Sequence, residues 1–513
     1  MPPRIALFCL LVALLFSATL AISQETAPPP KRPKIGLVLE GGGALGLAHV
    51  GVLQYFEEHR IPVSYVAGTS MGGLVGGIYA TGYSATQMTK LVHEIDWDDV
   101  LRGQIPFRDL AYRRKEDAID YPNSLEFGIK HGVKFPSGFN SGYLVGLLLD
   151  RIALPYSQIK NFDELPTPFA CVATDLVSSE RLVLRDGSLA AALRSTMSLP
   201  GIFTPMRTKK AILVDGGLLD NLPVDVALEM GAQFTIAIHL ESRDLPPTES
   251  LSSVGVLGQS ISAVISANEN RSKKMANILI SVPLTEFTSL DYEKDTAIIK
   301  KGYEAAAGKA AELSAYSVSE AEWNEYLAQR KARQRTVPIP QFVEVIGTKP
   351  YLATNIEREL GANVGKPVDT DELDRQLTLV VGDGRYSRLG FGMVDKDGQE
   401  GLQIQADEKQ YGPPFIRPLL LINGSAYNNP QFNIGARITF LDVGGFGSEW
   451  RSDVAIGYQY LAQTEYYHPL KKSPHWFMAP RLFAVNTQAD YYRGNTFITD
   501  YSNRQSGGAI DAG

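Results

Sequence analysis

The chain has 513 residues, of which 44% are hydrophobic and 20% are charged, and its formal net charge at pH 7 is −7. This composition excludes an intrinsically disordered protein, and the length predicts more than one domain. A negative net charge gives no general attraction to nucleic acid, so we expect no nucleic-acid partner.

The first residues have the pattern of an export signal. Arg4 precedes an apolar stretch, residues 5–21, that ends in small residues. A basic start, a short apolar core and a small-residue exit predict a secretory signal peptide over residues 1–23, with an uncleaved membrane anchor as the alternative. Residues 24–34 have the proline-rich composition of a linker. Removal of the signal leaves Cys171 as the only cysteine, so we expect no intramolecular disulfide.

Strand-like and helix-like segments alternate from residue 35 to about residue 332. The apolar runs "KIGLVLEGGG" and "PVSYVAGTS" are each followed by a segment of helical periodicity. Further strands are predicted in "PFACVATDL", "RLVLRDG", "AILVDGG" and "QFTIAIHL". The last helix is predicted to begin at the capping box Ser319-x-x-Glu322. This alternation predicts an α/β domain over residues 35–332, with a mainly parallel sheet.

Two glycine clusters, "EGGGALG" and "GTSMGG", occur about one strand–helix unit apart. A phosphate-binding P-loop needs Lys followed by Ser or Thr after its glycines, and no lysine follows here. A dinucleotide fingerprint can be placed on Gly41, Gly43 and Gly46, but the acidic residue expected about 20 positions later would fall near Val63, in an uncharged stretch. The sequence therefore disfavours both kinds of phosphate site.

The second cluster fits a serine nucleophile. Residues 68–72 form G-x-S-x-G between a predicted strand and a predicted helix, which is the pattern of an elbow that holds Ser70 on a strained turn. The hydroxyl would lie at a helix N-terminus, where a developing anion is favoured. The glycines at 41–43 could direct backbone N–H groups to one point and form an oxyanion hole, with a tight turn of no function as the alternative.

A serine nucleophile needs a base, and the sequence offers two candidates. His239 follows the strand "FTIAI" and would complete a Ser–Asp–His order. Asp215 ends the strand in "AILVDGG", and the two glycines after it leave room for a close neighbour. A carboxylate in a water-poor pocket can take the proton of a serine hydroxyl directly, so we favour Asp215, with an ordinary turn aspartate as the alternative. No cluster of His, Cys or carboxylates has metal-ligand spacing, so we expect neither a metal nor an organic cofactor.

The G-G-G run, the G-x-S-x-G elbow and the downstream D-G-G together resemble the patatin-like lipid acyl hydrolases, over residues 34 to about 311. The segment "STMSLPGIFTP" also resembles that family. The resemblance implies a three-layer α/β/α domain in which Ser70 is the nucleophile and Asp215 the base of a dyad without histidine. It also implies an oxyanion hole built from the backbone N–H groups of four residues: Gly41, Gly42, Gly43 and Ala44. Where the family usually has Arg or Lys, two residues after the third glycine, this chain has Leu45.

Two further regions follow the α/β domain. Residues 333–410 are predicted to contain strand, helix, helix, strand and strand, and they resemble a POTRA module. Residues 411–513 are rich in Tyr, Phe and Trp, and "WRSDVAIGYQYL" places Arg451 and Asp453 on one face. The opposite face carries the apolar and aromatic residues Trp450, Val454, Ile456, Tyr458 and Tyr460. Amphipathic strands of this kind predict the start of an antiparallel outer-membrane β-barrel, with a soluble β-sandwich as the alternative.

The whole arrangement resembles the patatin-type autotransporters of Gram-negative bacteria. We expect an exported serine lipid acyl hydrolase, phospholipase A-like, that cleaves phospholipid or other lipid esters through an acyl-enzyme. It would be tethered to the outer membrane, with the hydrolase domain at the cell surface or in the periplasm, and a homo-oligomer is compatible with the sequence. The alternatives are an outer-membrane secretion or assembly component with an inert α/β passenger, and a serine esterase of another ester.

The length of the last region sets a further expectation. About 95 residues follow Pro418, which is enough for about four to six membrane strands, whereas the smallest single-chain barrels need about eight. We therefore expect either that the 513 residues are part of a longer chain or that their strands pair with other subunits.

Overall fold

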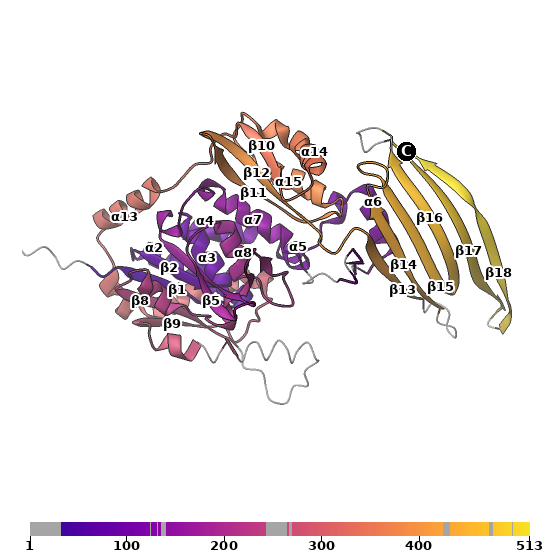
Figure 1. Cartoon of the computed structure of the whole chain (residues 1–513). Coiled ribbons are helices and arrows are strands. Elements are labelled where there is room, and N and C mark those ends of the chain that lie inside the picture. The colour runs from indigo at the N-terminus through magenta and orange to yellow at the C-terminus, as the bar shows by residue number, and fades with distance from the viewer. Residues whose placement is uncertain are drawn as a thin grey trace, which may run out of the picture.

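The computed structural model describes residues 32–123, 125–130, 132–134, 140–242, 264–265, 269–423, 431–470, 476–494 and 496–513. The predicted signal peptide and most of the predicted linker lie outside these residues. The described residues form three regions in chain order, which are an α/β domain, a small α+β module and a large antiparallel sheet (Figure 1).

The α/β domain is built on a sheet with the strand order β6-β7-β4-β2-β1-β8-β9, to which β5 adds by pairing with β4. Five consecutive strands of this order run parallel to one another: β1 (Ile35–Leu39), β2 (Tyr65–Thr69), β4 (Phe169–Asp175), β8 (Phe234–Glu241) and β9 (Ile278–Pro283). Three strands at one side are antiparallel: β5 (Glu180–Leu184), β6 (Met206–Arg207) and β7 (Ile212–Asp215). The prediction of a mainly parallel sheet is confirmed.

Helices cover both faces of this sheet. Leu37 and Leu39 of β1 pack in one hydrophobic core and Val38 packs in another, as the two-residue period of a strand requires. The larger core is covered by α2 (Ala48–Glu58), α3 (Met71–Ala80), α4 (Ala85–Glu94), α7 (Tyr143–Ala153), α8 (Leu189–Thr196) and α11 (Asp295–Gly308). On the opposite face lies α9 (Val224–Glu229). The domain therefore has the predicted α/β/α layers.

Further helices of the α/β domain are α5 (Trp97–Arg102), α6 (Tyr112–Asp120), α12 (Ala310–Leu313) and α13 (Glu320–Ala332). The predicted capping box begins α13, since the Ser319 hydroxyl accepts the N–H of Glu322 and the Glu322 carboxylate accepts the N–H of Ser319. No helix in the described ranges is both long and apolar enough to cross a membrane.

The small module has the predicted order of elements. It contains β10 (Phe342–Ile346), α14 (Pro350–Leu360), α15 (Thr370–Val381), β11 (Tyr386–Lys396) and β12 (Gln399–Glu408). In its sheet, β12 lies between β10, which is parallel to it, and β11, which is antiparallel. Tyr143 and Leu147 of α7 belong to the same hydrophobic core as Leu389 and Phe391 of β11, so the module packs on the α/β domain.

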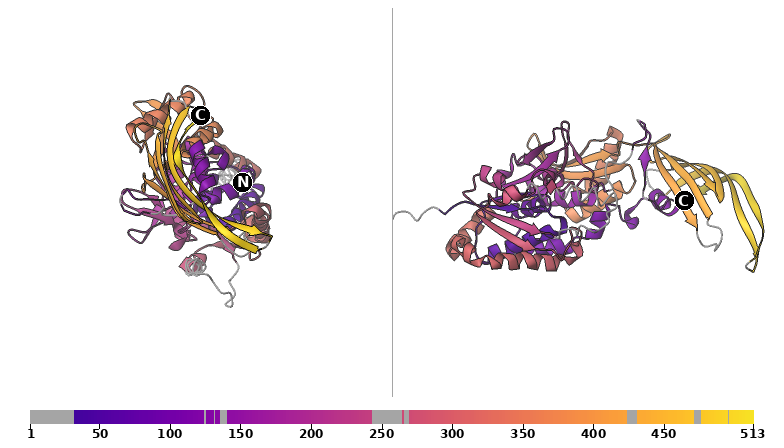
Figure 2. Two further views of the ribbon diagram at one scale, coloured as in Figure 1. Left: turned by 90° about the vertical axis from the view of Figure 1, so that its right-hand side faces the viewer. Right: turned by 90° about the horizontal axis from the view of Figure 1, so that it is seen from below.

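The C-terminal sheet is a meander of antiparallel strands that curves along its length (Figures 1 and 2). Its strands are β13 (Phe415–Asn423), β14 (Gln431–Leu441), β15 (Glu449–Gly457), β16 (Gln459–Pro469), β17 (Phe477–Arg493) and β18 (Thr496–Ala512). At one edge, β3 (Phe127–Gly128) from the α/β domain pairs with β13. A large antiparallel sheet is consistent with the predicted start of a barrel.

The two faces of this sheet differ in polarity, as the sequence predicts, but the polar face is the covered one. Trp450 and Ile456 are exposed, whereas Arg451 and Asp453 are only 3% and 2% exposed. The segment "WRSDVAIGYQYL" spans a turn, because β15 ends at Gly457 and β16 begins at Gln459. Val454 pairs with Ala462, which keeps the even-numbered residues of both strands on the apolar face.

Candidate active site

Ser70 lies at the sharp turn between β2 and α3. Its backbone has φ 54° and ψ −126°, in a region that non-glycine residues rarely adopt. The glycines of the motif make this turn sterically accessible. A Cβ atom on Gly68 would lie 2.5 Å from the Gly72 carbonyl oxygen, and one on Gly72 would lie 2.3 Å from the Leu39 carbonyl oxygen. The G-x-S-x-G residues therefore form the strained turn that their spacing predicts.

The structure brings Ser70 and Asp215 together, although 145 residues separate them. The Ser70 hydroxyl donates to Asp215 Oδ2 at 2.6 Å, and the Gly217 N–H donates to Oδ1 at 2.8 Å. Asp215 ends β7 and is 3% exposed. Burial raises the pKa of Asp215 to about 6, against the opposing effect of these two hydrogen bonds. A carboxylate with such a pKa is suited to accept a proton near neutral pH.

The residues at the end of α8 hold both groups in place. The Ser70 N–H donates to the Thr196 hydroxyl at 3.0 Å, and Thr196 donates in turn to the Val172 carbonyl. The Asp215 N–H donates to the Ser198 carbonyl at 3.0 Å. These contacts give a physical role to the segment "STMSLPGIFTP", for which the sequence alone indicates no contact.

The glycine loop lies beside the serine, and its last residue begins a 3-10 helix over Gly43–Leu47. A Cβ atom on Gly41 would lie 2.8 Å from the Ser70 Cβ. The Gly41 N–H donates to the Asn221 carbonyl at 3.2 Å, and the Ala44 N–H donates to the Ser289 carbonyl at 2.9 Å. Of the four N–H groups named for the oxyanion hole, only those of Gly42 and Gly43 have no such backbone acceptor within the described ranges.

Asn221 fixes the first glycine of this loop from two directions. Its carbonyl accepts the Gly41 N–H, and its side-chain Nδ2 donates to the Gly41 carbonyl at 3.2 Å. The same Nδ2 donates to Glu269 Oε1 at 2.7 Å. Sequence reasoning did not identify Asn221, although it follows Asp215 in "DGGLLDNLP". Leu45 is buried in the larger core. At the position where the family usually has a basic residue, this chain therefore has a side chain that contributes to apolar packing.

His239, the alternative base, has a different partner. Its Nδ1 lies 2.7 Å from Glu40 Oε2, an oxygen that also accepts the Leu240 N–H at 2.5 Å. Burial raises the pKa of Glu40 to about 7, although the hydrogen bond with His239 lowers it. The hydrogen bonds of the described residues thus connect the Ser70 hydroxyl to Asp215 and the His239 ring to Glu40.

Glu40, His239 and Glu269 each offer a donor atom within 4.8 Å of the others, which is a spacing that could hold a metal ion. The sequence does not reveal this group because its members lie far apart along the chain. Glu269 is also 3.5 Å from Lys273 Nζ. Since Glu40 contacts His239 and Glu269 contacts a lysine, a basic partner is available to each carboxylate without a metal ion.

Comparison with known proteins finds a family model that matches part of the α/β domain. Residues 37–228 match the family model described as patatin-like phospholipase. The chain carries a patatin-like phospholipase domain. Ser70, Asp215 and the glycine loop all lie inside the matched segment of this patatin-like domain, whereas His239 and Glu269 lie after it.

Several known proteins are similar to the patatin-like domain. Patatin-like phospholipase domain-containing protein 6 of Homo sapiens is 34% identical over 213 residues, which are 41% of this chain and 14% of that protein. An uncharacterized NTE family protein of Mycobacterium tuberculosis is 30% identical over 215 residues, 42% of this chain and 51% of that protein. The chain therefore spans between about a seventh and about half of the length of these relatives. The crystal structure of VipD from Legionella pneumophila is similar with a TM-score of 0.31 and 18% identity, covering 56% of this chain and 67% of that chain.

Proposed function

We propose that the patatin-like domain is a serine lipid acyl hydrolase, phospholipase A-like, that works through a Ser70–Asp215 dyad. The observation that carries the proposal is the 2.6 Å hydrogen bond from the Ser70 hydroxyl to the buried Asp215 carboxylate, on a strained strand–helix turn. A match to a phospholipase family supports lipid esters as the substrate class. The chemistry needs no cofactor, since the dyad supplies both the nucleophile and the base.

The geometry supports the following mechanism. Asp215 Oδ2 takes the proton of the Ser70 hydroxyl as Oγ attacks the ester carbonyl. The N–H groups of Gly42 and Gly43 stabilise the negative oxygen of the tetrahedral intermediate. Collapse of the intermediate releases the alcohol, which leaves with the proton held by Asp215, and an acyl group stays on Ser70. A water molecule then attacks the carbonyl of the acyl-enzyme and gives a proton to Asp215. Asp215 returns this proton to Ser70 Oγ as the bond between Oγ and the acyl carbon breaks and the fatty acid leaves.

Hydrolysis of a phospholipid panel and labelling with a fluorophosphonate probe test this proposal. We expect Ser70→Ala to lose both turnover and labelling, and Asp215→Asn to lose turnover by about 100-fold or more because the general base is gone. His239→Asn is the matched control, because its amide can keep the hydrogen bond to Glu40. Phospholipid hydrolysis by purified Ser70→Ala protein above that of a mock preparation would overturn the dyad.

We further propose that the chain is exported and that the C-terminal sheet is embedded in the outer membrane of a Gram-negative bacterium. The supporting observations are the export-signal pattern of residues 1–23, an exposed apolar sheet face and a polar opposite face, as a membrane barrel requires. The module before the sheet has the element order expected of a POTRA module. Fractionation of cells that naturally produce the protein, with alkaline extraction of the membranes, tests this proposal. Recovery of the protein in the extracted supernatant would contradict it.

A further inference from the structure

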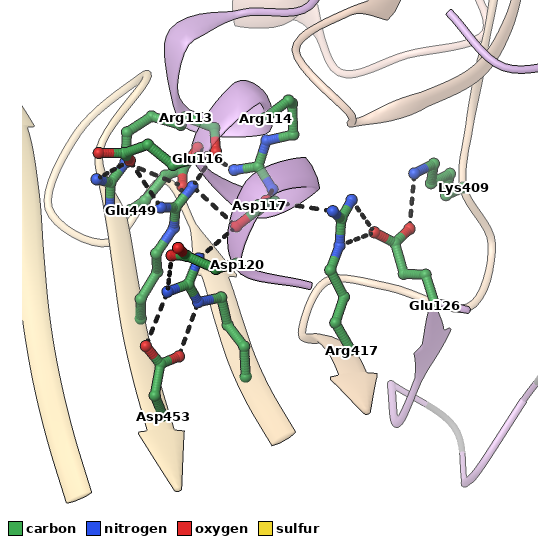
Figure 3. A network of polar contacts seen from close by, with 12 residues as sticks. Arg113, Arg114, Glu116, Asp117, Asp120, Glu126, Lys409, Arg417, Glu449 and Asp453 are labelled. Carbon is green, nitrogen blue, oxygen red and sulfur yellow. Dashed lines mark hydrogen bonds and ion pairs between the residues drawn. The ribbon is translucent and has the colours of Figure 1, made fainter. Parts of the chain in front are cut away.

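The helix α6 belongs to the patatin-like domain but lies against the C-terminal sheet (Figures 1 and 3). It occurs between α5 and α7, so it interrupts the α/β domain in the sequence. Its contacts reach strands more than 300 residues later, as in the hydrogen bond from Arg437 to Asp117, which spans 320 positions. These two parts of the chain therefore share an interface that no local segment could form.

Asp117 is the centre of this interface. Its side chain is completely buried, and three arginines of the sheet converge on it (Figure 3). Arg437 lies 2.8 Å from its carboxylate, Arg451 3.3 Å and Arg417 3.6 Å. Arg114, one turn earlier on α6, is also paired with it. One carboxylate of α6 thus faces three cations that belong to the sheet.

Cations of α6 also pair with carboxylates of the sheet. Arg113 of α6 donates to Glu465 at 2.5 Å, and Arg114 donates to Glu449 at 2.5 Å. Both arginines are buried. The main chain takes part as well, since Arg451 donates to the Arg113 carbonyl at 2.8 Å. The contact is reciprocal, with donors and acceptors supplied by both parts.

The segment that follows α6 extends the same interface. Glu126 accepts hydrogen bonds from Lys409 at 2.6 Å and from Arg417 at 2.8 Å. The strand β3 pairs through its backbone with Phe415 and Ile416 of β13. Burial alone would raise the pKa of Glu126, but the two cations lower it to about 2, so the carboxylate stays charged.

Removal of a single charge from this network would be strongly unfavourable while its partners stay buried. A buried charge that loses its partner is left uncompensated. Burial by itself would raise the pKa of Asp117, yet Arg114, Arg451, Arg417 and Arg437 hold it well below its ordinary range. Without α6, Arg437 would keep Asp453 and Arg451 would keep Glu449. Both guanidinium groups would nevertheless lose the Asp117 carboxylate that lies between them. The polar face of the sheet therefore matches a helix that carries both acidic and basic side chains.

We propose that α6 anchors the patatin-like domain permanently on the polar face of the C-terminal sheet, so that the domain stays with the sheet even when the chain is cut between them. The description of the anchored domain as an enzyme rests on the proposed function, but the anchor itself does not. The domain would act beside the membrane as a bound hydrolase and would not be released as a separate product.

The test uses the full chain with a specific protease site inserted between Arg335 and Thr336, in an exposed stretch, and an affinity tag after Gly513. The protein is extracted in mild detergent, cut, and captured through the tag in 1 M NaCl. We expect the N-terminal piece to be captured with the C-terminal piece. Because capture is followed on gels, a failure of the proposed hydrolysis would leave this result unchanged.

Two variants separate the contact made by α6 from the contact between α7 and the small module. Asp117→Asn removes the central charge of the α6 interface, and we expect capture of the N-terminal piece to fall at least tenfold. Asp374→Asn is the matched control, because Asp374 lies 2.6 Å from Arg151 in the contact between α7 and the module. We expect capture from the control to equal that of the unchanged protein. Capture unaffected by Asp117→Asn, or separation of the unchanged pieces, would overturn the proposal.

A milder variant covers the case in which Asp117→Asn does not fold. Glu465→Gln removes the charge of one partner of Arg113, at a side chain that is 14% exposed, and leaves the charge of Asp117 in place. We expect a partial loss of capture that grows with the salt concentration during washing. Equal capture of this variant and the unchanged protein at every salt concentration would contradict the anchor.

Discussion

At the scale of single residues, the burial of Asp215 sets how the dyad responds to pH. Because burial raises its pKa to about 6, the carboxyl is protonated below that pH and cannot accept the proton of Ser70. We expect kcat/KM for a short-chain phospholipid to rise as the pH passes through about 6 and to be level above it. Initial rates between pH 4 and pH 9 measure this profile. An unchanged midpoint in His239→Asn protein is expected, and a midpoint that moves with this substitution would assign the titration to the histidine.

Asn221 is expected to position the glycine loop. Replacement by Ala removes the side-chain hydrogen bond to the Gly41 carbonyl, so the N–H groups of Gly42 and Gly43 lose a fixed direction. Loss of one oxyanion donor typically costs about 100-fold or more in turnover, and we expect at least about tenfold for a displaced loop. Asn363→Ala, at another buried asparagine that lies in the small module, is the control for a general loss of stability. Fluorophosphonate labelling of Ser70 should continue in both variants, and equal kcat in both would assign Asn221 a purely structural role.

The residues of the candidate site differ in how far the sequence predicts them. Ser70, Asp215 and the three glycines occur in short local patterns, because each must build a particular turn. Thr196 and Asn221 act through hydrogen bonds to residues far away in the chain, and a threonine or an asparagine has many other uses. Their roles become visible only when the fold brings these segments together.

At the scale of whole elements, the alternation of apolar and helical patterns in the sequence predicts most strands and helices of the α/β domain. It also predicts the order of the elements in the small module. The sequence patterns did not predict β9, nor the two-residue strands β3 and β6. A two-residue strand carries no period, and β3 exists because β13 offers it a partner. The sequence also does not predict that α6 is buried, since a charged segment such as "YRRKEDAID" is ordinarily solvated. Its burial depends on arginines that belong to another region.

The contact between α2 and α11 depends on glycine. A Cβ atom on Gly302 would lie 1.8 Å from the Ala48 carbonyl oxygen, whereas one on Gly308, in the same helix, would meet nothing within 4 Å. We expect Gly302→Ala to destabilise the domain by about 1–3 kcal/mol, because the two helices must move apart. Gly308→Ala should be neutral or stabilising by about 0.5–1 kcal/mol through helix propensity. Thermal unfolding of both variants measures the difference, and a similar Tm in both would contradict the close packing.

At the scale of the whole molecule, the exposed face of the C-terminal sheet is expected to contact lipid. Ile456 is 63% exposed and pairs with Ile434, which is 58% exposed on the same face. A charge placed there should weaken membrane insertion, by about 2–4 kcal/mol if the residue lies near the bilayer centre. We expect Ile456→Arg protein to be partly lost from alkaline-extracted membranes. Leu327→Arg is the control, since Leu327 is an exposed apolar residue of α13. Equal retention of both variants would place the Ile456 face outside the bilayer.

The anchoring helix has a consequence for how such a chain changes in evolution. The sequence boundary near residue 332 separates two folds, yet the carboxylate of Asp117 pairs across it with the guanidinium groups of Arg417, Arg437 and Arg451. A chimera that joins a foreign hydrolase domain to this sheet would bring an unmatched helix to those arginines, unless residues 107–128 were transferred with the sheet. Substitutions at Asp117 should accordingly be inherited together with substitutions at one or more of the three arginines.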